Sequence, residues 1–135
     1  MNDQLYQERI VALAKAKTGA GKLAAPTRSA RKDNPLCGDR VTIELKLDGQ
    51  GKIAEIAHQV RGCLLCQASA AALASVAVGR DAKGISQLRH DAERALGHES
   101  GPAGEPFAAF APVAAHKSRH DCVLLPFEAI EEALA

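Results

Sequence analysis

The chain has 135 residues, a length typical of one domain, with 47% hydrophobic residues but only 3% aromatic ones. Because Trp is absent, Ala, Leu, Ile and Val must supply most of the core. The net charge is only +1, from 17 basic and 16 acidic residues, which argues against nucleic acid as the main partner because phosphate binding requires a clear basic surplus. We expect residues 1–135 to form a single domain.

No segment of the sequence predicts insertion into a membrane or export across one. The first residues are polar and lack the basic-then-apolar order of a secretory signal. The most apolar stretch, residues 63–78, is too short and too polar to span a bilayer. We therefore expect a cytoplasmic protein, in which thiols stay reduced. In that compartment four cysteines indicate metal or sulfur chemistry before they indicate disulfides.

Residues 1–33 are predicted to form an N-terminal helix and a basic connector. Asn2 or Asp3 can cap a helix that runs to about Lys17, with apolar residues along one stripe. Glycines then end the helix, and residues 22–32 follow as the connector. Positive charge is concentrated here by Lys15, Lys17, Lys22, Arg28, Arg31 and Lys32. They indicate either a solvated loop or a surface that docks an acidic protein.

The middle of the chain predicts a β-hairpin followed by two helices. Residues 41–47 alternate apolar and polar side chains, which is the period of a half-buried strand. A glycine-containing turn follows, and residues 52–60 form the returning strand. The alanine-rich residues 66–78 predict a buried helix that ends at a glycine, and residues 86–96 predict a shorter helix.

The last part of the chain predicts a long loop and a final helix. Residues 97–118 contain several Gly and Pro residues, which indicates a mobile, functional loop. The final helix is predicted to start near Cys122 and to tolerate Pro126 in its first turn. The combination predicts an α+β fold in which helices pack on a small antiparallel β-sheet.

Cysteines and one aspartate lie where predicted elements begin or end. Cys37 and Asp39 precede the first strand and Cys63 follows the second. These two ends of an antiparallel hairpin lie side by side, so we expect Cys37 near Cys63, whereas the position of Cys122 depends on how the last helix packs. The partial positive charge at a helix N-terminus favours the thiolate form of Cys63 and of Cys122. The glycines beside Cys37 and Cys63 would let the backbone approach a metal. Three thiols and a carboxylate predict a four-coordinate site for zinc or for iron in an iron–sulfur cluster.

Three segments carry a resemblance to a known family. Residues 34–39 read Asn-Pro-Leu-Cys-Gly-Asp, residues 62–63 read Gly-Cys with Ala-Ser at 68–69, and Cys122 opens an alanine-containing helix. In these three segments the chain resembles the iron–sulfur cluster assembly scaffolds of the IscU, SufU and NifU N-terminal type. The resemblance implies a compact α+β domain and a site for one metal ion or one nascent [2Fe–2S] cluster. The implied ligands are Cys37, Asp39, Cys63 and Cys122. It also implies a pyridoxal-phosphate cysteine desulfurase, SufS-like, as sulfur donor and apo-proteins as recipients.

Within this family the chain is most similar to SufU-like members. The spacing between Cys63 and Cys122 is longer than in IscU-type scaffolds and similar to the SufU insertion, and Arg119 stands three residues before Cys122 as in SufU-type sequences. Asp121 replaces the histidine that directly precedes the last cysteine in IscU. The chain also lacks the Leu-Pro-Pro-Val-Lys stretch that the dedicated Hsp70 chaperone recognises in IscU. This argues against chaperone-driven release of the cluster.

Residues around the predicted site leave several interpretations open. Asp39 is interpreted as a hard oxygen ligand that makes the site easier to open. Cys66 is interpreted first as a small core residue, with a spare ligand, a sulfur-relay thiol or a redox pair with Cys63 as alternatives. Arg119 either neutralises the negative charge of the site or is an ordinary surface arginine. His120 is expected to be exposed rather than a ligand. The other histidines show no mutual spacing that predicts a site; they are His58, His90, His98 and His116.

Three functions follow as hypotheses, and they differ in whether the protein is an enzyme. The first is a scaffold that holds a transient [2Fe–2S] cluster while it is built and passed on. The second is a Zn-dependent sulfurtransferase in which one thiolate is freed to accept persulfide sulfur; this is Cys37 by resemblance to SufU or Cys122 by resemblance to IscU. The third is a binding module with a structural zinc. The sequence leaves open the metal, the recipient and whether the chain forms a homo-oligomer.

Overall fold

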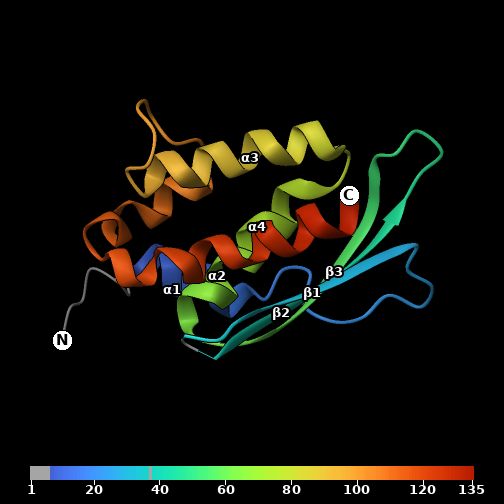
Figure 1. Cartoon of the computed structure of the whole chain (residues 1–135), viewed down its shortest axis with the longest axis horizontal. Helices are drawn as coiled ribbons and strands as arrows, with labels where there is room; N and C mark the ends of the chain where they lie inside the picture. The colour runs from blue at the N-terminus through green and yellow to red at the C-terminus, as the bar shows by residue number, and fades with distance from the viewer. Residues whose placement is uncertain (1–6, 37) are drawn as a thin grey trace.

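The computed structural model describes residues 7–36 and 38–135, which form a three-stranded antiparallel sheet with helices packed on one of its faces (Figure 1). This confirms the predicted α+β class. Within the described residues no helix combines the length and apolar character needed to cross a bilayer. The elements in chain order are α1 (Glu8–Ala16), β1 (Arg28–Asn34), β2 (Asp39–Leu47), β3 (Ile53–Arg61), α2 (Leu64–Ala77), α3 (Ala82–Ala95), the 3₁₀ helices η2 (Phe107–Ala115) and η3 (Lys117–Arg119), and α4 (His120–Leu134).

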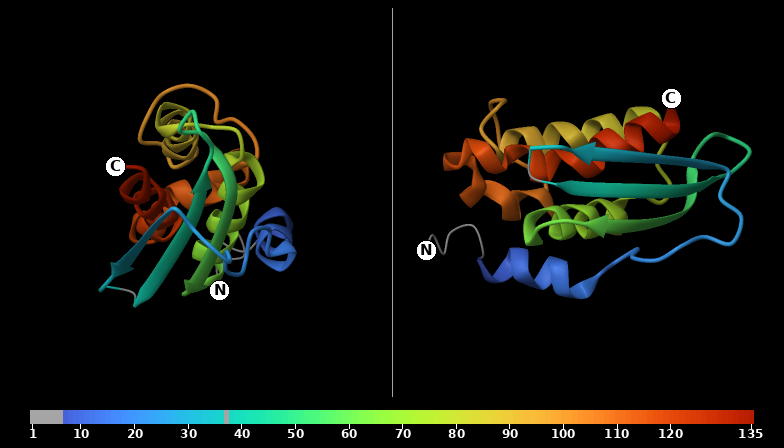
Figure 2. Two further views of the ribbon diagram at one scale, coloured as in Figure 1. Left: turned by 90° about the vertical axis from the view of Figure 1, so that its right-hand side faces the viewer. Right: turned by 60° about the horizontal axis from the view of Figure 1, so that its bottom comes forward.

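The sheet has the strand order β1-β2-β3, and its central strand decides which face is buried. Val41, Ile43 and Leu45 on β2 are fully buried, whereas the residues between them are only partly covered. This alternation confirms the predicted strand at residues 41–47, and β3 confirms the returning strand. The two views of Figure 2 show the helices on one side of the sheet and the other side facing outward.

The strand β1 was not predicted, because its residues were interpreted as part of a basic connector. It pairs with β2 along its whole length, from Arg28 opposite Leu45 to Asn34 opposite Asp39. Its sequence, Arg-Ser-Ala-Arg-Lys-Asp-Asn, has one apolar residue and no alternation of apolar and polar side chains. A charged edge strand of this kind is held by backbone hydrogen bonds and resists pairing with other chains, so its sequence resembles that of a loop.

The first helix begins later than predicted. The predicted caps, Asn2 and Asp3, lie outside the described residues, and α1 begins at Glu8 after an extended Gln7. It ends before Lys17, whose φ of 52° is left-handed, as expected for the end of a helix. Ile10 and Ala14 are its buried residues and lie in the same core as α2.

The alanine-rich helix α2 lies at the centre of the molecule, in contact with α1, β3 and α4. Ten of its 14 residues are buried, as expected of a largely apolar helix inside a domain, and its alanines let neighbouring helices approach closely. The hydroxyl of Ser69 donates a 2.5 Å hydrogen bond to the carbonyl of Val123, which joins α2 to the first turns of α4. The prediction of a buried helix here is confirmed.

Residues 97–118, predicted as a mobile loop containing Gly and Pro, include two short helices. The helices are η2 and η3, and η2 buries Phe107, Phe110 and Val113 against the rest of the core. The Phe107 ring packs at an angle on Phe127 of α4, with ring centroids 5.3 Å apart. Gly and Pro in this segment interrupt regular helix, but the phenylalanines between them supply enough apolar area to hold it in place.

The final helix starts at His120, two residues before Cys122, close to its predicted start. Pro126 therefore lies in the second turn of α4 and not in the first. Its ring has no N–H group and cannot donate to the carbonyl of Cys122 four residues earlier. The packing of α4 against α2, β1 and β2 maintains the helix despite this lost hydrogen bond.

Candidate metal centre

Asp39, Cys63 and Cys122 come together at one end of the sheet from three different elements. Asp39 is the first residue of β2, Cys63 is the N-cap of α2, and Cys122 lies in the first turn of α4. One candidate ligand atom from each lies within 4.8 Å of the others. The hairpin places Asp39 next to the end of β3, and the packing of α4 on α2 brings Cys122 to the same place. Cys37, which the sequence analysis places beside Cys63, lies outside the described residues.

Asp39 is held in place by the backbone of its neighbour. Its Oδ1 accepts a 3.2 Å hydrogen bond from the backbone N–H of Cys63, and its Oδ2 lies 3.6 Å from the Cys63 Sγ. The side chain is 4% exposed. A Cβ atom at Gly62 would lie 2.6 Å from Asp39 Oδ1 and 2.7 Å from its Cγ. In the described structure Gly62 is therefore needed because its missing side chain leaves room for Asp39. Its predicted role was to let the backbone approach a metal.

The thiol of Cys63 is tuned towards the thiolate. A hydrogen bond from Cys122 is the largest influence on its pKa, which is lowered from 9.0 to about 7. Burial and the charge of Asp39 act in the opposite direction, while the backbone N–H groups of Cys66 and Leu65 in the first turn of α2 help to lower the pKa. Cys63 is half-buried and Cys122 is 1% exposed. A large fraction of Cys63 is therefore the form that binds metal at neutral pH.

Two of the donor atoms of this group are spaced as ligands of a tetrahedral ion would be. Zn–S bonds of about 2.3 Å and Zn–O bonds of about 2.0 Å put neighbouring ligand atoms roughly 3.5–3.8 Å apart. The separation between Cys63 Sγ and Asp39 Oδ2 is 3.6 Å, within that range. Two thiols and one carboxylate suit zinc or iron better than magnesium or calcium, which prefer oxygen ligands alone.

Cys66 belongs to the core and not to this group. It is fully buried in the cluster of apolar side chains that α2 contributes to the core. The group formed by Asp39, Cys63 and Cys122 does not include it. This position is the one expected of a small core residue.

His120 was expected to be exposed, and this expectation is wrong, because it is only 7% exposed. Its Nε2 donates to the carbonyls of Val113 and Ala114, each at 3.1 Å, and its Nδ1 lies 2.7 Å from Nε2 of His98. The other nitrogen of His98 lies 2.5 Å from a carboxylate oxygen of Glu93. Both ring nitrogens of His120 are engaged in hydrogen bonds, which leaves neither for a metal.

The pairing of His98 with His120 is a feature that the sequence analysis missed. The two residues stand far apart in the sequence, and their contact depends on how residues 97–118 fold against α4. Arg119, the predicted charge partner, is the N-cap of α4 and precedes the buried His120. No sequence signal distinguishes His120 from an exposed histidine, since its burial is set by η2.

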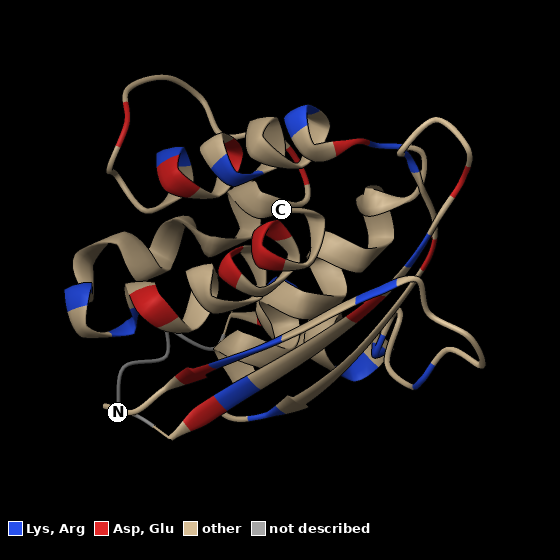
Figure 3. Ribbon diagram, turned by 45° about the vertical axis from the view of Figure 1, so that its right-hand side comes forward, with Lys and Arg blue, Asp and Glu red and all other residues tan. Residues whose placement is uncertain are grey.

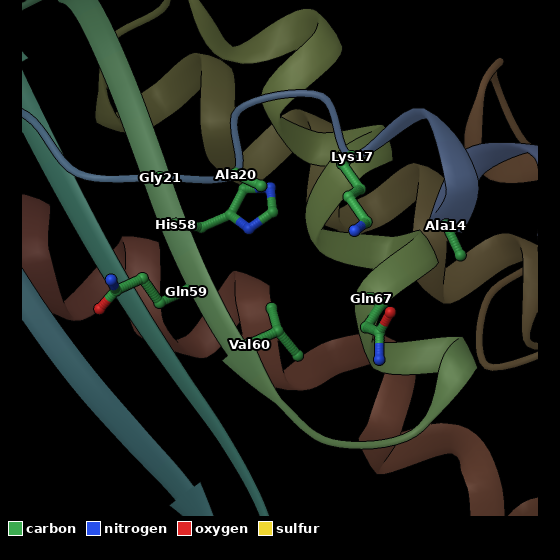
Figure 4. A pocket seen from close by; sticks show the side chains of 8 residues that line it. All are labelled: Ala14, Lys17, Ala20, Gly21, His58, Gln59, Val60 and Gln67. Carbon is green, nitrogen blue, oxygen red and sulfur yellow. The ribbon is translucent and has the colours of Figure 1, made fainter.

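A separate hollow of about 340 Å³ lies between α1, β3 and α2 (Figure 4). His58 lines it and is 4% exposed; its Nε2 donates a 2.7 Å hydrogen bond to the carbonyl of Thr18, and its Nδ1 is buried with no hydrogen-bond partner among the described residues. Burial lowers the pKa of His58 against the opposing effect of the Thr18 carbonyl. Lys17 and Gln67 line the same hollow, which contains none of the residues of the metal centre. His58 has no predicted role.

The chain is similar to proteins of a known family. The family model of the NifU-like N-terminal domain matches residues 5–135. The chain is 32% identical over 117 residues to the bifunctional protein NifU/MnmA of Rubrobacter xylanophilus, which covers 86% of this chain but only 24% of that protein. It is 27% identical over 132 residues to the iron–sulfur cluster assembly scaffold protein IscU of Thermotoga maritima, covering 96% of this chain and 92% of IscU.

Solved structures share the same fold. A NifU-like protein (N-terminal) from Brucella abortus superimposes with a TM-score of 0.86 and 33% identity, over 97% of this chain and 92% of that one. A putative iron–sulfur cluster assembly scaffold protein for the SUF system from Fervidobacterium islandicum gives a TM-score of 0.89 with 27% identity, over 100% of both chains. The fold of residues 7–36 and 38–135 is thus the fold of these scaffold proteins.

Proposed function

Because the chain belongs to the NifU-like N-terminal domain family of iron–sulfur cluster assembly scaffolds, we propose that it builds and passes on a [2Fe–2S] cluster. The cluster is the cargo, and its proposed ligands are Cys37, Asp39, Cys63 and Cys122. The observation that supports this most is the convergence of Asp39, Cys63 and Cys122, because these side chains gather from distant segments. The proposed place of action is the cytoplasm.

The proposed role of Asp39 is to keep the site labile. A carboxylate oxygen binds iron or zinc more weakly than a thiolate does, so one carboxylate among thiolates lets the cargo leave. Asp39 also orients the thiol beside it through the N–H of Cys63. Arg119 is proposed as the cation that balances the negative charge of three thiolates and one carboxylate on a divalent ion.

The proposed sulfur donor is a pyridoxal-phosphate cysteine desulfurase of the SufS type. The candidate acceptors are Cys37 and Cys122. In the transfer, the acceptor thiolate attacks the outer sulfur of the donor's persulfide, a new S–S bond forms on the acceptor, and the donor's cysteine leaves as a thiolate. Cys37 is preferred because the chain resembles SufU-like members and because Cys122 is only 1% exposed.

Leu36 provides a contact point for the desulfurase. It is one of only two large hydrophobic residues that are strongly exposed in the described part of the chain. Asn34 contacts the residues around it: its Oδ1 accepts from the N–H of Leu36 at 3.1 Å and its carbonyl accepts from the N–H of Gly38 at 2.8 Å. An exposed apolar side chain suits insertion into a partner's pocket.

A Zn-dependent sulfurtransferase is the second candidate function. It is favoured by the spacing of two of the donor atoms, which suits a tetrahedral zinc ion, and by the likeness to the SUF-system scaffold from Fervidobacterium. In this function zinc holds the same four residues until the desulfurase docks, and sulfur rather than a cluster passes to recipient apo-proteins. The two functions use the same site and differ in what it carries.

The experiment that separates these functions is analysis of protein purified without oxygen. Iron with acid-labile sulfide supports the scaffold, and stoichiometric zinc without sulfide supports the sulfurtransferase. The desulfurase is then mixed with this protein and cysteine, and alanine release is measured. Stimulation that is lost in Cys37→Ser and kept in Cys66→Ala supports the proposed acceptor. Zinc without any stimulation contradicts both functions and leaves a structural-zinc module.

The labile role of Asp39 has its own test. Asp39→Ala should retain its metal or cluster for longer than the wild type when challenged with a chelator, because the exchangeable oxygen ligand is gone. Asp33→Ala is the matched control, since Asp33 is also a sheet aspartate but pairs with Arg40 instead. Faster loss from Asp39→Ala than from the control would contradict this role.

A further inference from the structure

The face of the sheet that the helices leave uncovered carries a hollow lined by arginines. This arginine hollow has a volume of about 410 Å³ and crosses all three strands. Its lining residues are Arg31 on β1, Arg40 and Thr42 on β2, and Gln59 and Arg61 on β3. In Figure 3, blue segments lie next to one another on neighbouring strands of this sheet.

The register of the sheet forces these positive charges together. Arg40 stands directly opposite Arg61, and Arg31 stands opposite Thr42, the next outward-facing residue on β2. Like charges that face each other across two strands destabilise a sheet. Asp33 offsets part of this charge through a 2.7 Å ion pair with Arg40, and within the described residues no ion pair involves Arg31 or Arg61. An unfavourable cluster of this kind is explained if a partner neutralises it.

The open part of this face lies at the same end as the metal centre. The N–H of Leu23 donates to Glu44 Oε1 at 2.8 Å, so the segment before β1 crosses the outer face further along the sheet. Nearer the centre, a second hollow of about 390 Å³ shares Arg40 and Arg61 with the arginine hollow and is also lined by Asp39. A partner seated on the arginines therefore reaches the centre.

We propose that the arginine hollow is the docking surface for an acidic segment of a protein partner. The guanidinium groups of Arg31, Arg40 and Arg61 present forked donors that match carboxylates in pairs. The whole chain carries a net charge of only +1, so the basic excess is local and suits a short acidic segment better than a long polyanion. That this partner exchanges cargo with the centre rests on the proposed function, whereas the hollow and its charge do not.

The test uses a peptide and involves no metal, sulfur or desulfurase, so its failure is distinguishable from failure of the proposed function. The wild-type protein, labelled with ¹⁵N, is titrated with a twelve-residue peptide of alternating Glu and Ser and, separately, with the same peptide carrying Gln for Glu. Only the Glu peptide should shift amide signals, and these should belong to β1, β2 and β3 around the arginine hollow. The binding should weaken as salt is added, because the pairs are solvent-exposed.

Two matched variants decide whether the hollow is responsible. Arg31→Gln/Arg40→Gln/Arg61→Gln should bind the Glu peptide at least about fivefold more weakly, as expected for the loss of three exposed charge pairs. Lys52→Gln/Lys83→Gln/Lys117→Gln removes the same charge from exposed residues elsewhere and should change the affinity less than about twofold. The arginine variant should unfold at the same or a higher temperature, because the repulsion between Arg40 and Arg61 is gone, so lost binding is not lost folding.

Three outcomes overturn this proposal. The first is a set of shifted amides that lies away from the outer face of the sheet. The second is an equal loss of affinity in the two triple variants, which would show that overall charge alone attracts the peptide. The third is tighter binding of a twelve-nucleotide single-stranded DNA than of the Glu peptide at the same salt concentration, which would assign the face to nucleic acid instead.

Discussion

Gly62 illustrates how tightly the metal centre is built at the level of single residues. Any other residue at position 62 would carry a Cβ atom in the space that the Asp39 carboxylate occupies. That Cβ atom would lie only 2.6 Å from Asp39 Oδ1. The carboxylate cannot move away easily, because Asp39 is 4% exposed and accepts a hydrogen bond from the backbone N–H of Cys63, the residue after Gly62. The absence of one side chain therefore fixes the position of one proposed ligand.

Gly62→Ala should displace Asp39 from the centre. We expect a loss of about 1–3 kcal/mol in the free energy of unfolding from the overlap. As in Asp39→Ala, we also expect slower loss of metal to a chelator, because the labile oxygen ligand is shifted away. Denaturant unfolding and a chelator challenge measure these effects. The control is Gly49→Ala, because a Cβ atom at Gly49 meets nothing within 4 Å. Equal rates of metal loss from the two variants would contradict the proposed placement of Asp39.

Cys63 gives the centre its dependence on pH. Its pKa of about 7 results mainly from the hydrogen bond with Cys122, against the ordinary value of 9.0. In metal-free protein, the rate at which iodoacetamide alkylates Cys63, followed by mass spectrometry, should rise with a midpoint near pH 7. Cys122→Ala should raise that midpoint, because it removes the donor that lowers the pKa most, and Asp39→Asn should lower it by less, because the aspartate charge opposes the thiolate. A midpoint near 9 in the wild type would contradict this assignment.

The same pKa predicts how the stability of the metal-free protein varies with pH. A group whose pKa is lower in the folded state than in the unfolded state stabilises the fold where it is ionised in both. This contribution of Cys63 is fully present above about pH 9 and is lost as the pH falls through about 7. The free energy of unfolding should therefore rise between these values, and Cys63→Ser should flatten that rise.

At the scale of elements, a chain of hydrogen bonds joins α3, η2 and α4. Glu93 and His98 lie at the end of α3, His120 opens α4, and the carbonyls of Val113 and Ala114 lie near the end of η2. His120 also lies two residues before Cys122. The network thus connects the packing of residues 97–118 to the position of one proposed ligand.

His120→Ala should destabilise the protein by about 1–3 kcal/mol, because it leaves two carbonyls and the ring of His98 without their buried partner. His90→Ala is the matched control. His90 pairs with Glu99 in the same region, but its side chain is 53% exposed, so its loss should cost less than about 1 kcal/mol. Denaturant unfolding measures both. Equal stability of the two variants would show that the buried network contributes no more than a surface pair.

Helices and strands could be predicted only where their burial leaves a pattern of apolar and polar residues in the sequence. In β2 the alternation of Val41, Ile43 and Leu45 with polar residues indicated the strand, because one face of it is buried. The strand β1 has no such alternation, since it lies at the edge of the sheet and the buried side chains belong to β2, with which it pairs. In η2 the buried Phe107 and Phe110 lie among Gly and Pro residues that indicated a loop.

At the scale of the whole molecule, α2 decides where the other elements lie. It contacts α1, β3 and α4, and its buried alanines let these elements pack closely against it. Ser69 and Ala72 lie one turn apart on the side that faces α4, where the Ser69 hydroxyl donates to Val123. The distance between Cys63 on α2 and Cys122 on α4 follows from this packing.

Ala72→Leu should separate α2 from α4. We expect a loss of about 1–3 kcal/mol in the free energy of unfolding from overpacking, together with weaker zinc binding because Cys122 moves relative to Cys63. Ala82→Leu is the control, since Ala82 is exposed at the start of α3. Thermal unfolding and zinc competition measure the two effects. Zinc affinity that stays at the wild-type value in Ala72→Leu would contradict the link between this packing and the centre.

Local signals of alternation, composition or motif were enough to predict the class of the fold, the strands β2 and β3, the buried helix and the candidate ligands Asp39, Cys63 and Cys122. The motif named Cys122 as a partner of Cys63, but no local signal showed how it comes to lie there. That contact, the burial of His120, the need for Gly62 and the pairing of Arg40 with Arg61 became apparent only in the folded structure. Each of these depends on distances between segments far apart in the chain, which are set by the volume that α2 leaves between its neighbours and by the register of the sheet.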